Sequence, residues 1–303
     1  MTEILIRAAC FVAIIFLGFI LREKGFFKKE DFHIISKIVL KITLPAAIIS
    51  NFSRADISPF MLFISLLGFG GGIVMMIGGA LLYAGKDREK RAFAVLNISG
   101  YNIGNFAMPF VQSFLGSVGV VATSLFDAGN ALICLGGSYG VASMIKYGEG
   151  KVSFRLIGEK LLKSLPFDTY LVMTVISLLH IQLPSPITTF TGIIGSSNTF
   201  MAMLMIGVGF ELSGERSQIK DIVKIIGMRC VLSAVLAAVF FFLLPVGIEY
   251  RRALAVLAFS PVASANPPYT AAMKSDFGLS SAVNSVSIIV SMVLMTIVLI
   301  AVL

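Results

Sequence analysis

The sequence predicts an all-α integral membrane protein of ten transmembrane helices, arranged as two inverted five-helix repeats with crossed, broken helices 4 and 9. Of its 303 residues, 57% are hydrophobic and 13% are charged, and the mean hydropathy is +0.95. This composition leaves too little polar surface for a soluble domain of that size. Apolar runs of about 20 residues recur along the whole chain, and one segment of the first half returns in the second.

Ten apolar runs, separated by charged or turn-rich stretches, give the expected helices. Their approximate extents are 4–21, 33–52, 59–84, 92–115, 119–145, 165–181, 187–212, 222–245, 252–273 and 279–303. The first run lacks a basic leader and a small-residue cleavage site, so we expect it to be retained as a span. The spans divide into a first repeat (1–146), a basic linker (147–164) and a second repeat (165–303).

The positive charges predict the orientation. Nineteen of the 24 Lys and Arg residues lie in or beside the loops that follow the odd-numbered spans, and three lie on the opposite side. Basic loops face the cytoplasm, so we expect a multi-pass protein of the cytoplasmic membrane with both termini outside. The net charge of +8 then reflects topology, and no nucleic-acid partner is expected. Arg7 and Arg229 fall inside spans, each near a helix end, where we expect them to reach the lipid headgroups.

The repeat is the most informative feature. Residues 91–105 read RAFAVLNISGYNIGN and residues 252–266 read RALAVLAFSPVASAN, with seven of fifteen aligned positions identical. Five spans per half is an odd number, so the halves have opposite orientations. In both copies the apolar run is interrupted by Ser, Gly, Pro or Asn about 16 Å from its start, near the middle of a hydrocarbon core of about 30 Å. Paired broken helices mark the binding site of secondary transporters, and kinks that serve helix packing alone are the alternative.

The polar residues at the two breaks are the candidate substrate ligands: Ser99, Asn102, Gly104 and Asn105 in span 4, with Ser264 and Asn266 in span 9. The candidate helix-breaking prolines are Pro45, Pro109, Pro261, Pro267 and Pro268. A half-helix that begins at mid-membrane presents unpaired N–H groups and the positive end of its dipole. Two such ends attract an anion, and we expect the asparagine amides to orient it.

Asp127 is the only acidic residue deep inside an expected span. Intramembrane carboxylates are costly and usually line a pathway or pair with a base. Together with Asn130 it is the candidate coupling-ion site, where it would exchange a proton or help to coordinate sodium. A carboxyl group held by neighbouring side chains is the structural alternative, and the choice of coupling ion is left open.

Two segments resemble a known family. The run Leu44-Pro45-Ala46-Ala47-Ile48-Ile49 and the pattern Asn102-x-Gly104-x-x-x-x-Pro109 are similar to those of the auxin efflux carrier family, whose bacterial members include malonate and malate permeases. The resemblance covers the whole chain in span number, basic central loop and repeat. It implies a ten-helix, inverted-repeat fold similar to bile-acid symporters and sodium/proton antiporters. Ala107, Phe200 and the Asn266-Pro267-Pro268 run depart from the usual pattern, so the resemblance does not imply the substrate.

These features predict a secondary active transporter that moves a small organic anion, such as a carboxylate, across the cytoplasmic membrane by alternating access. The alternatives are an ion-coupled symporter or antiporter for another solute, and a membrane channel or sensor. No enzyme is expected, because the sequence has no catalytic cluster, nucleophile elbow or phosphate loop. Cys10, Cys134 and Cys230 lack metal-ligand spacing, so neither a metal nor a disulfide framework nor a cofactor is expected. A homodimer is left open.

Overall fold

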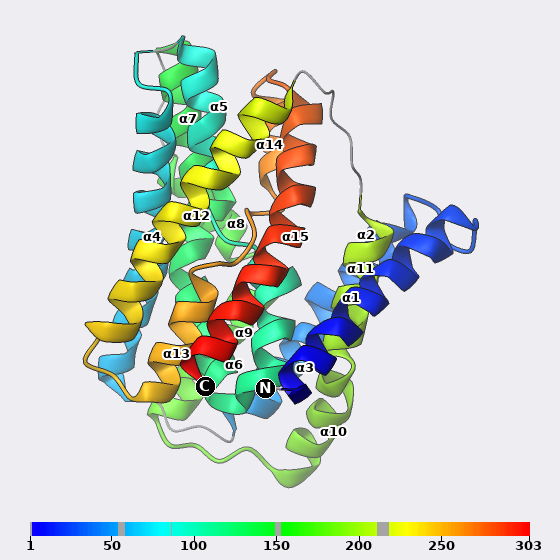
Figure 1. Cartoon of the computed structure of the whole chain (residues 1–303). Coiled ribbons are helices and arrows are strands. Elements are labelled where there is room, and N and C mark those ends of the chain that lie inside the picture. Colours follow the sequence, from blue (N-terminus) through cyan, green and yellow to red (C-terminus); the bar gives the residue numbers. More distant parts are fainter. Residues whose placement is uncertain (1, 54–57, 86, 149–152, 211–217) are drawn as a thin grey trace.

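The computed structural model describes residues 2–53, 58–85, 87–148, 153–210 and 218–303, and every regular element in these ranges is helical (Figure 1). Within them, seven helices or helix series are long and apolar enough to cross a membrane. The number rises to eight if the bent pair α8 (Phe154–Leu161) and α9 (Leu165–Leu178) is one span. The chain is therefore an all-helical membrane protein, and the count of ten spans stays a prediction.

Each expected span corresponds to helix over at least part of its length. The remaining elements are α1 (Thr2–Glu23), α2 (Asp31–Ile38), η1 (Val39–Thr43), α3 (Leu44–Phe52), η2 (Pro59–Leu62), α4 (Phe63–Leu82), α5 (Arg88–Ile98), η3 (Ile103–Ala107), α6 (Met108–Leu132), η4 (Ile133–Gly137), α7 (Ser138–Tyr147), α10 (Ser185–Ser196), α11 (Asn198–Val208), α12 (Ile219–Phe242), α13 (Ile248–Leu257), α14 (Asn266–Ala272) and α15 (Phe277–Val302). Gly116, at φ 56° and ψ −146°, interrupts α6. The chain passes from α5 through α6 to α7, and α5 and α7 lie at the same end of the molecule (Figure 1).

The helices pack as two groups. The core bundle consists of α4, α5, α6, α7, α12, α13, α14 and α15, and the side panel consists of α1, α2, η1, α3, α9, α10 and α11. The two groups meet where α6 contacts α3, α9 and α11, and where α1 contacts α15. Both chain termini lie toward the same end of the molecule (Figure 1).

Glycines bring α4 and α6 into close contact. A Cβ atom on Gly68 would lie 1.9 Å from the carbonyl oxygen of Phe126, and one on Gly129 would lie 1.7 Å from that of Ser65. Helices in lipid associate through packing, so small residues at the contact let the backbones approach. The segment of α6 that carries Asp127 is therefore held directly against α4.

Both expected helix breaks are present. Helix α5 ends at Ile98 and helical structure resumes at Ile103, while α13 ends at Leu257 and α14 begins at Asn266. In Figure 1, α5 and α13 approach the centre from opposite ends of the molecule. The interruptions therefore fall where the Ser, Gly, Pro and Asn residues indicate.

The prolines act in different ways. Pro267 and Pro268 lie in the first turn of α14, where a missing N–H group loses no hydrogen bond. Pro109 follows the π-helical turn η3, which runs directly into α6, so the helix is continuous at this proline. Pro261 lies within the unwound stretch of span 9. At Pro45 the helix is continuous, because the π-helical turn η1 precedes it and joins α2 to α3. Pro45 thus distorts span 2 without breaking it.

Candidate substrate-binding site at the helix crossing

The two unwound stretches bond directly to each other. The main-chain N–H of Asn102 donates to the carbonyl oxygen of Pro261 over 2.9 Å. The side-chain Nδ2 of Asn266 donates to the carbonyl oxygen of Ser99 over 3.2 Å. Each bond joins span 4 to span 9, so the two breaks form one structural unit.

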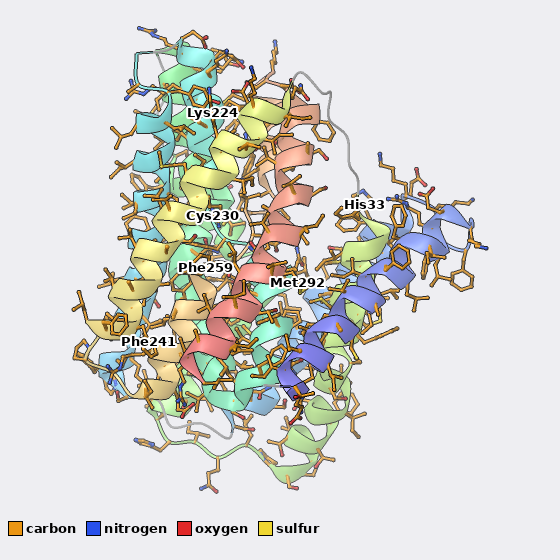
Figure 2. All side chains as sticks on the ribbon, in the orientation of Figure 1. His33, Lys224, Cys230, Phe241, Phe259 and Met292 are labelled. Carbon is orange, nitrogen blue, oxygen red and sulfur yellow. The ribbon has the colours of Figure 1, made fainter. Side chains whose placement is uncertain are left out.

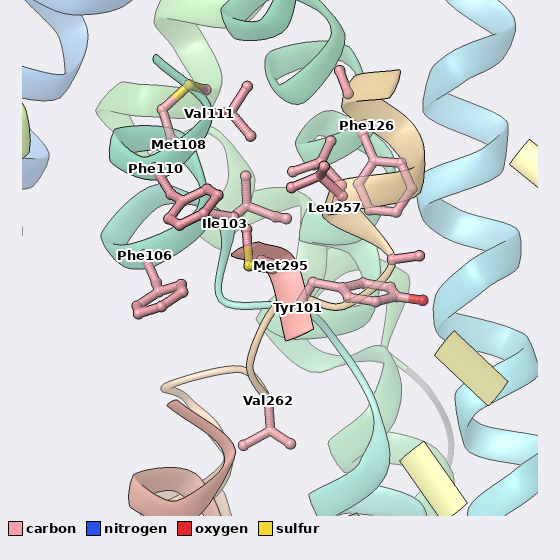
Figure 3. Packing of buried hydrophobic residues seen from close by; sticks show 14 of the residues in the cluster. Tyr101, Ile103, Phe106, Met108, Phe110, Val111, Phe126, Leu257, Val262 and Met295 are labelled. Atoms are coloured by element: carbon pink, nitrogen blue, oxygen red, sulfur yellow. The ribbon is translucent and has the colours of Figure 1, made fainter. Parts of the chain in front are cut away.

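Asn130, on α6, holds the peptide groups of Tyr101. Its Oδ1 accepts from the Tyr101 N–H and its Nδ2 donates to the Tyr101 carbonyl oxygen, both over 2.9 Å. Unpaired backbone groups are costly in an apolar interior, and this side chain satisfies two of them. The Tyr101 ring meets Phe126 edge-on with centroids 5.3 Å apart (Figure 3). The unwound stretch is therefore fixed in position by its backbone and by its side chain.

Arg229, on α12, binds carbonyl groups of both breaks. Its Nη2 donates to Ser260 over 2.8 Å and to Pro261 over 3.0 Å, and its Nη1 donates to the carbonyl oxygen of Ile98. The guanidinium carbon lies 4.9 Å from the centroid of the Tyr101 ring, in cation–π geometry. One side chain thus ties together the ends of α5 and α13.

The sequence-based interpretation of Arg229 as an interfacial residue is wrong. The residue is 4% exposed. It is the eleventh of 24 residues in α12, and Figure 2 shows its neighbour Cys230 well inside that helix, between Lys224 and Phe241. Counted from the start of α12 at Ile219, Arg229 lies ten residues, or about 15 Å, into the helix. The expected span began at residue 222 and placed Arg229 nearer to the helix end than it is.

A cavity of about 170 Å³ lies beside the crossing. Its walls come from both breaks, from α6 and η4, and from three parts of the side panel, namely η1, α3 and the start of α9. The lining residues are Leu40, Leu44, Tyr101, Asn102, Ile103, Gly104, Asn105, Asp127, Asn130, Ala131, Cys134, Leu135, Ser164, Pro166, Ala263, Ser264 and Ala265. Because both helix groups contribute walls, a relative movement of the groups changes the shape and the access of the cavity.

The structure divides the expected substrate ligands into two sets. Asn102, Gly104, Asn105 and Ser264 line the cavity, and Asn105 Nδ2 donates to Ser264 Oγ over 3.3 Å. The other two, Ser99 and Asn266, are fully buried away from it. The hydroxyl of Ser99 bonds to the carbonyl of Val95 in its own helix, and the amide of Asn266 holds Ser99 as described above. Their observed contacts hold the crossing together.

The side-chain amide of Asn102 has no partner among the described residues of the protein. Asn102 is 6% exposed and lines the cavity, yet no hydrogen bond to its side chain occurs in the described part of the chain. Buried polar groups are normally paired. The N–H groups of Gly104 and Asn105, in the first turn of η3, also lie where a helix has no internal acceptor for them. All three residues line the cavity.

The second half-helix offers fewer donors than the sequence suggests. Pro267 and Pro268 occupy the first turn of α14 and have no N–H group. The start of η3 is therefore the main source of backbone donors at the crossing.

Asp127 connects the two helix groups at the cavity wall. Its Oδ2 accepts from the hydroxyl of Tyr170, on α9, over 3.0 Å, and its Oδ1 accepts from Asn130 Nδ2 over 2.9 Å. The Oδ1 of Asn130 accepts from the Tyr101 N–H and from the thiol of Cys134, which is 3.3 Å away. Since an amide oxygen has two lone pairs, that oxygen has little capacity left for a cation. Of the two candidate coupling residues, Asp127 has the ionisable group.

Comparison with known proteins supports transport. Residues 4–303 match the model of a family described as membrane transport protein. An uncharacterized transporter of Methanothermobacter thermautotrophicus is 25% identical over 260 residues, which cover 82% of this chain and 79% of that protein. The family match includes both helix breaks and every cavity-lining residue. The chain therefore belongs to the membrane transport protein family, that is, to the auxin efflux carrier family whose patterns it carries in spans 2 and 4.

Proposed function

We propose that this membrane transporter is a secondary active carrier that moves a small organic anion, a carboxylate, through the helix crossing by alternating access. The amide of Asn102, which lines the cavity and has no hydrogen-bond partner in the described part of the chain, carries the proposal. An amide that borders a cavity and is not engaged by the protein can donate to the oxygen atoms of a substrate that enters there.

The electrostatics of the cavity favour an anion of modest charge. The start of η3 contributes N–H groups and the positive end of a helix dipole, a combination that binds carboxylates and phosphates. No Lys or Arg is among the described residues that line the cavity. Recognition therefore depends on amides and backbone groups. A volume of about 170 Å³ is small beside the roughly 300–1,000 Å³ of pockets for drug-sized ligands, which favours a solute of a few carbon atoms.

In this proposal, Asp127 couples the movement of the substrate to that of a proton. An ionised carboxylate in the same small cavity repels an anionic substrate. The substrate therefore binds best when Asp127 carries a proton, and by linkage the proton binds best when the substrate is present. Proton and anion then cross together.

Two features support alternating access. The cavity has walls from both the core bundle and the side panel. The Tyr170–Asp127 bond also joins the groups, so its formation depends on their relative position. A movement of the core bundle against the side panel therefore changes the access of the cavity and the environment of Asp127 in a single step.

A second candidate is an ion-coupled carrier for a neutral or cationic solute, which the carboxylate of Asp127 favours. Uptake into liposomes that contain the purified protein separates the candidates. Small mono- and dicarboxylates are compared with their amides, which have the same shape without the charge. The proposal expects saturable uptake and counterflow for a carboxylate and none for its amide. Preference for the amide supports the second candidate, and flux that does not saturate indicates a channel.

A further inference from the structure

The crossing contains a permanent positive charge that the sequence did not reveal. Arg229 is 4% exposed, and no carboxylate pairs with it in the described part of the chain. Its partners are the carbonyl oxygens of Ile98, Ser260 and Pro261, and the face of the Tyr101 ring. A buried charge without an opposite charge is costly, so these carbonyl groups must provide its compensation.

The arrangement of helix ends explains how they do so. Ile98 is the last residue of α5, and Ser260 and Pro261 follow the last turn of α13. Each helix C-terminus carries a partial charge of about −0.5. Two ends that meet at one point thus present about one negative charge, which a single monovalent cation neutralises. The guanidinium group meets this requirement and donates to both ends.

In transporters with broken helices, unwound carbonyl groups and half-helix C-termini are the ligands of coupling sodium ions. Here these groups are already engaged. Arg229 binds three of the carbonyl oxygens, Asn266 binds that of Ser99, and Asn130 binds that of Tyr101. A sodium ion at this position would compete with donors that belong to the protein itself.

We propose that Arg229 is a positioning residue that serves as the permanent counter-cation of the crossing, in the place of a coupling sodium ion. It holds the ends of α5 and α13 together in every step of the cycle, so that transport requires no sodium. The statement that transport does not use sodium rests on the proposed function. The assignment of Arg229 as counter-cation rests on the hydrogen bonds alone.

The first test uses the wild-type protein in detergent, without substrate. Its thermal unfolding temperature is measured in sodium, potassium and choline chloride at equal ionic strength. We expect the same temperature in all three salts, because no sodium site is available to be filled. An unfolding temperature that rises and saturates with sodium overturns the inference. Since no substrate is present, a wrong substrate assignment does not affect the result.

The second test uses variants of Arg229. In Arg229→Ala we expect a lower unfolding temperature and a loss of uptake, because the carbonyl groups at the two helix ends lose their cation. Guanidinium ion at millimolar concentration should raise the unfolding temperature of this variant and not that of the wild type, whereas urea at the same concentration should raise neither. Equal responses to guanidinium and urea contradict a role for the charge.

Matched controls separate the charge from packing. Arg229→Lys keeps a cation in the same place, so it should keep more uptake than Arg229→Gln and remain independent of sodium. Arg22 is the control residue, because its Nη1 donates to the carbonyl oxygens of Val208 and Phe210 at the end of α11, over 3.1 and 2.7 Å, away from the cavity. Arg22→Ala should transport normally. If Arg229→Ala does not fold, the sodium replacement on the wild type and the comparison of Lys with Gln decide the question.

Discussion

The main-chain N–H of Asn102 donates to the carbonyl oxygen of Pro261 across 2.9 Å, and this bond joins two residues that are 159 positions apart. One break therefore completes the backbone hydrogen bonding of the other. The bond also fixes Asn102 at the point where its side chain lines the cavity. A residue of the first half thus depends on the second half for its position at the candidate site.

Loss of the Asn102 amide should weaken substrate binding. In Asn102→Ala we expect a cost of about 1–3 kcal/mol, since a hydrogen bond to a desolvated substrate is lost, and thus a fall in affinity of roughly five- to a hundredfold. The measurement is the concentration dependence of uptake in liposomes. Asn51→Ala is the control, because Asn51 bonds to Ala47 and Ser117 and does not line the cavity. Normal affinity in a folded Asn102→Ala protein would remove Asn102 from the binding site.

Asp127 should make uptake depend on pH. We expect uptake of a permanently ionised substrate to increase as the pH falls, because a protonated Asp127 no longer repels it. In Asp127→Asn, which mimics the neutral form, this dependence should disappear. The measurement is the initial rate of uptake at equal pH on both sides of the liposome membrane.

A second Asp–Tyr pair provides the control for this prediction. Asp221 accepts from the hydroxyl of Tyr83 over 2.6 Å and does not line the cavity. Asp221→Asn should keep the wild-type pH profile. If Asp127→Asn also keeps it, Asp127 is a structural carboxyl group, and if the variant instead loses a dependence on sodium, Asp127 belongs to a cation site.

Close packing of α4 on α6 should make Gly68 sensitive to substitution. The Cβ atom of Gly68→Ala meets the carbonyl oxygen of Phe126 at 1.9 Å, and overpacking of this kind costs about 1–3 kcal/mol. Gly70, two residues away on the same helix, has open space within 4 Å of the point where a Cβ atom would lie, so Gly70→Ala should be harmless. Thermal unfolding of both variants in detergent checks the contrast, and equal stability of the two contradicts the packing.

Cys134 offers a chemical probe of the cavity. Its thiol lines the cavity and lies 3.3 Å from the Oδ1 of Asn130. In a protein with Cys10 and Cys230 replaced by Ala, a transported substrate should slow the reaction of Cys134 with a small maleimide, because both occupy the same space. The same protein with Cys134→Ala gives the background. A substrate that is transported without slowing the reaction contradicts this path.

The orientation in the membrane remains a prediction of the basic loops. In a variant whose only cysteine is at Arg155→Cys, a membrane-impermeant maleimide should react only after the cells are opened. The native side chain of Arg155 is 91% exposed on α8, so access is not limited by burial. Tags on both termini should be reached from outside the cell. Labelling of the Arg155→Cys protein in intact cells would contradict the proposed orientation.

The breaks in spans 4 and 9 were predictable because their cause is local. Gly100 has a φ of +71°, which L side chains rarely adopt, and Pro261 cannot donate to a helix. Residues of this kind within an apolar run indicate an interruption wherever the rest of the chain lies. The sequence also identified Asp127 as a candidate coupling residue, since a carboxylate within an apolar run is rare.

The partition of the polar residues was not predictable. Ser99 and Asn266 have the same chemistry as Ser264 and Asn105, yet the first pair is buried within the crossing and the second pair lines the cavity. Which side chain faces the cavity depends on the rotation of each half-helix about its axis. That rotation follows from packing between helices distant in sequence.

The sequence by itself therefore determined three things: that this is a membrane protein, that its helices are interrupted at two places, and that the two interrupted segments repeat each other in sequence. It could do so because composition and local backbone preference are properties of short segments. Only the tertiary structure decided that Arg229 binds both interruptions and that Asp127 bonds to Tyr170. The guanidinium partners lie 131, 31 and 32 residues away and are backbone carbonyls, which every residue carries. No residue pattern distinguishes the carbonyl groups that lose their helical partners and turn toward one point, so their position emerges only when the two halves cross.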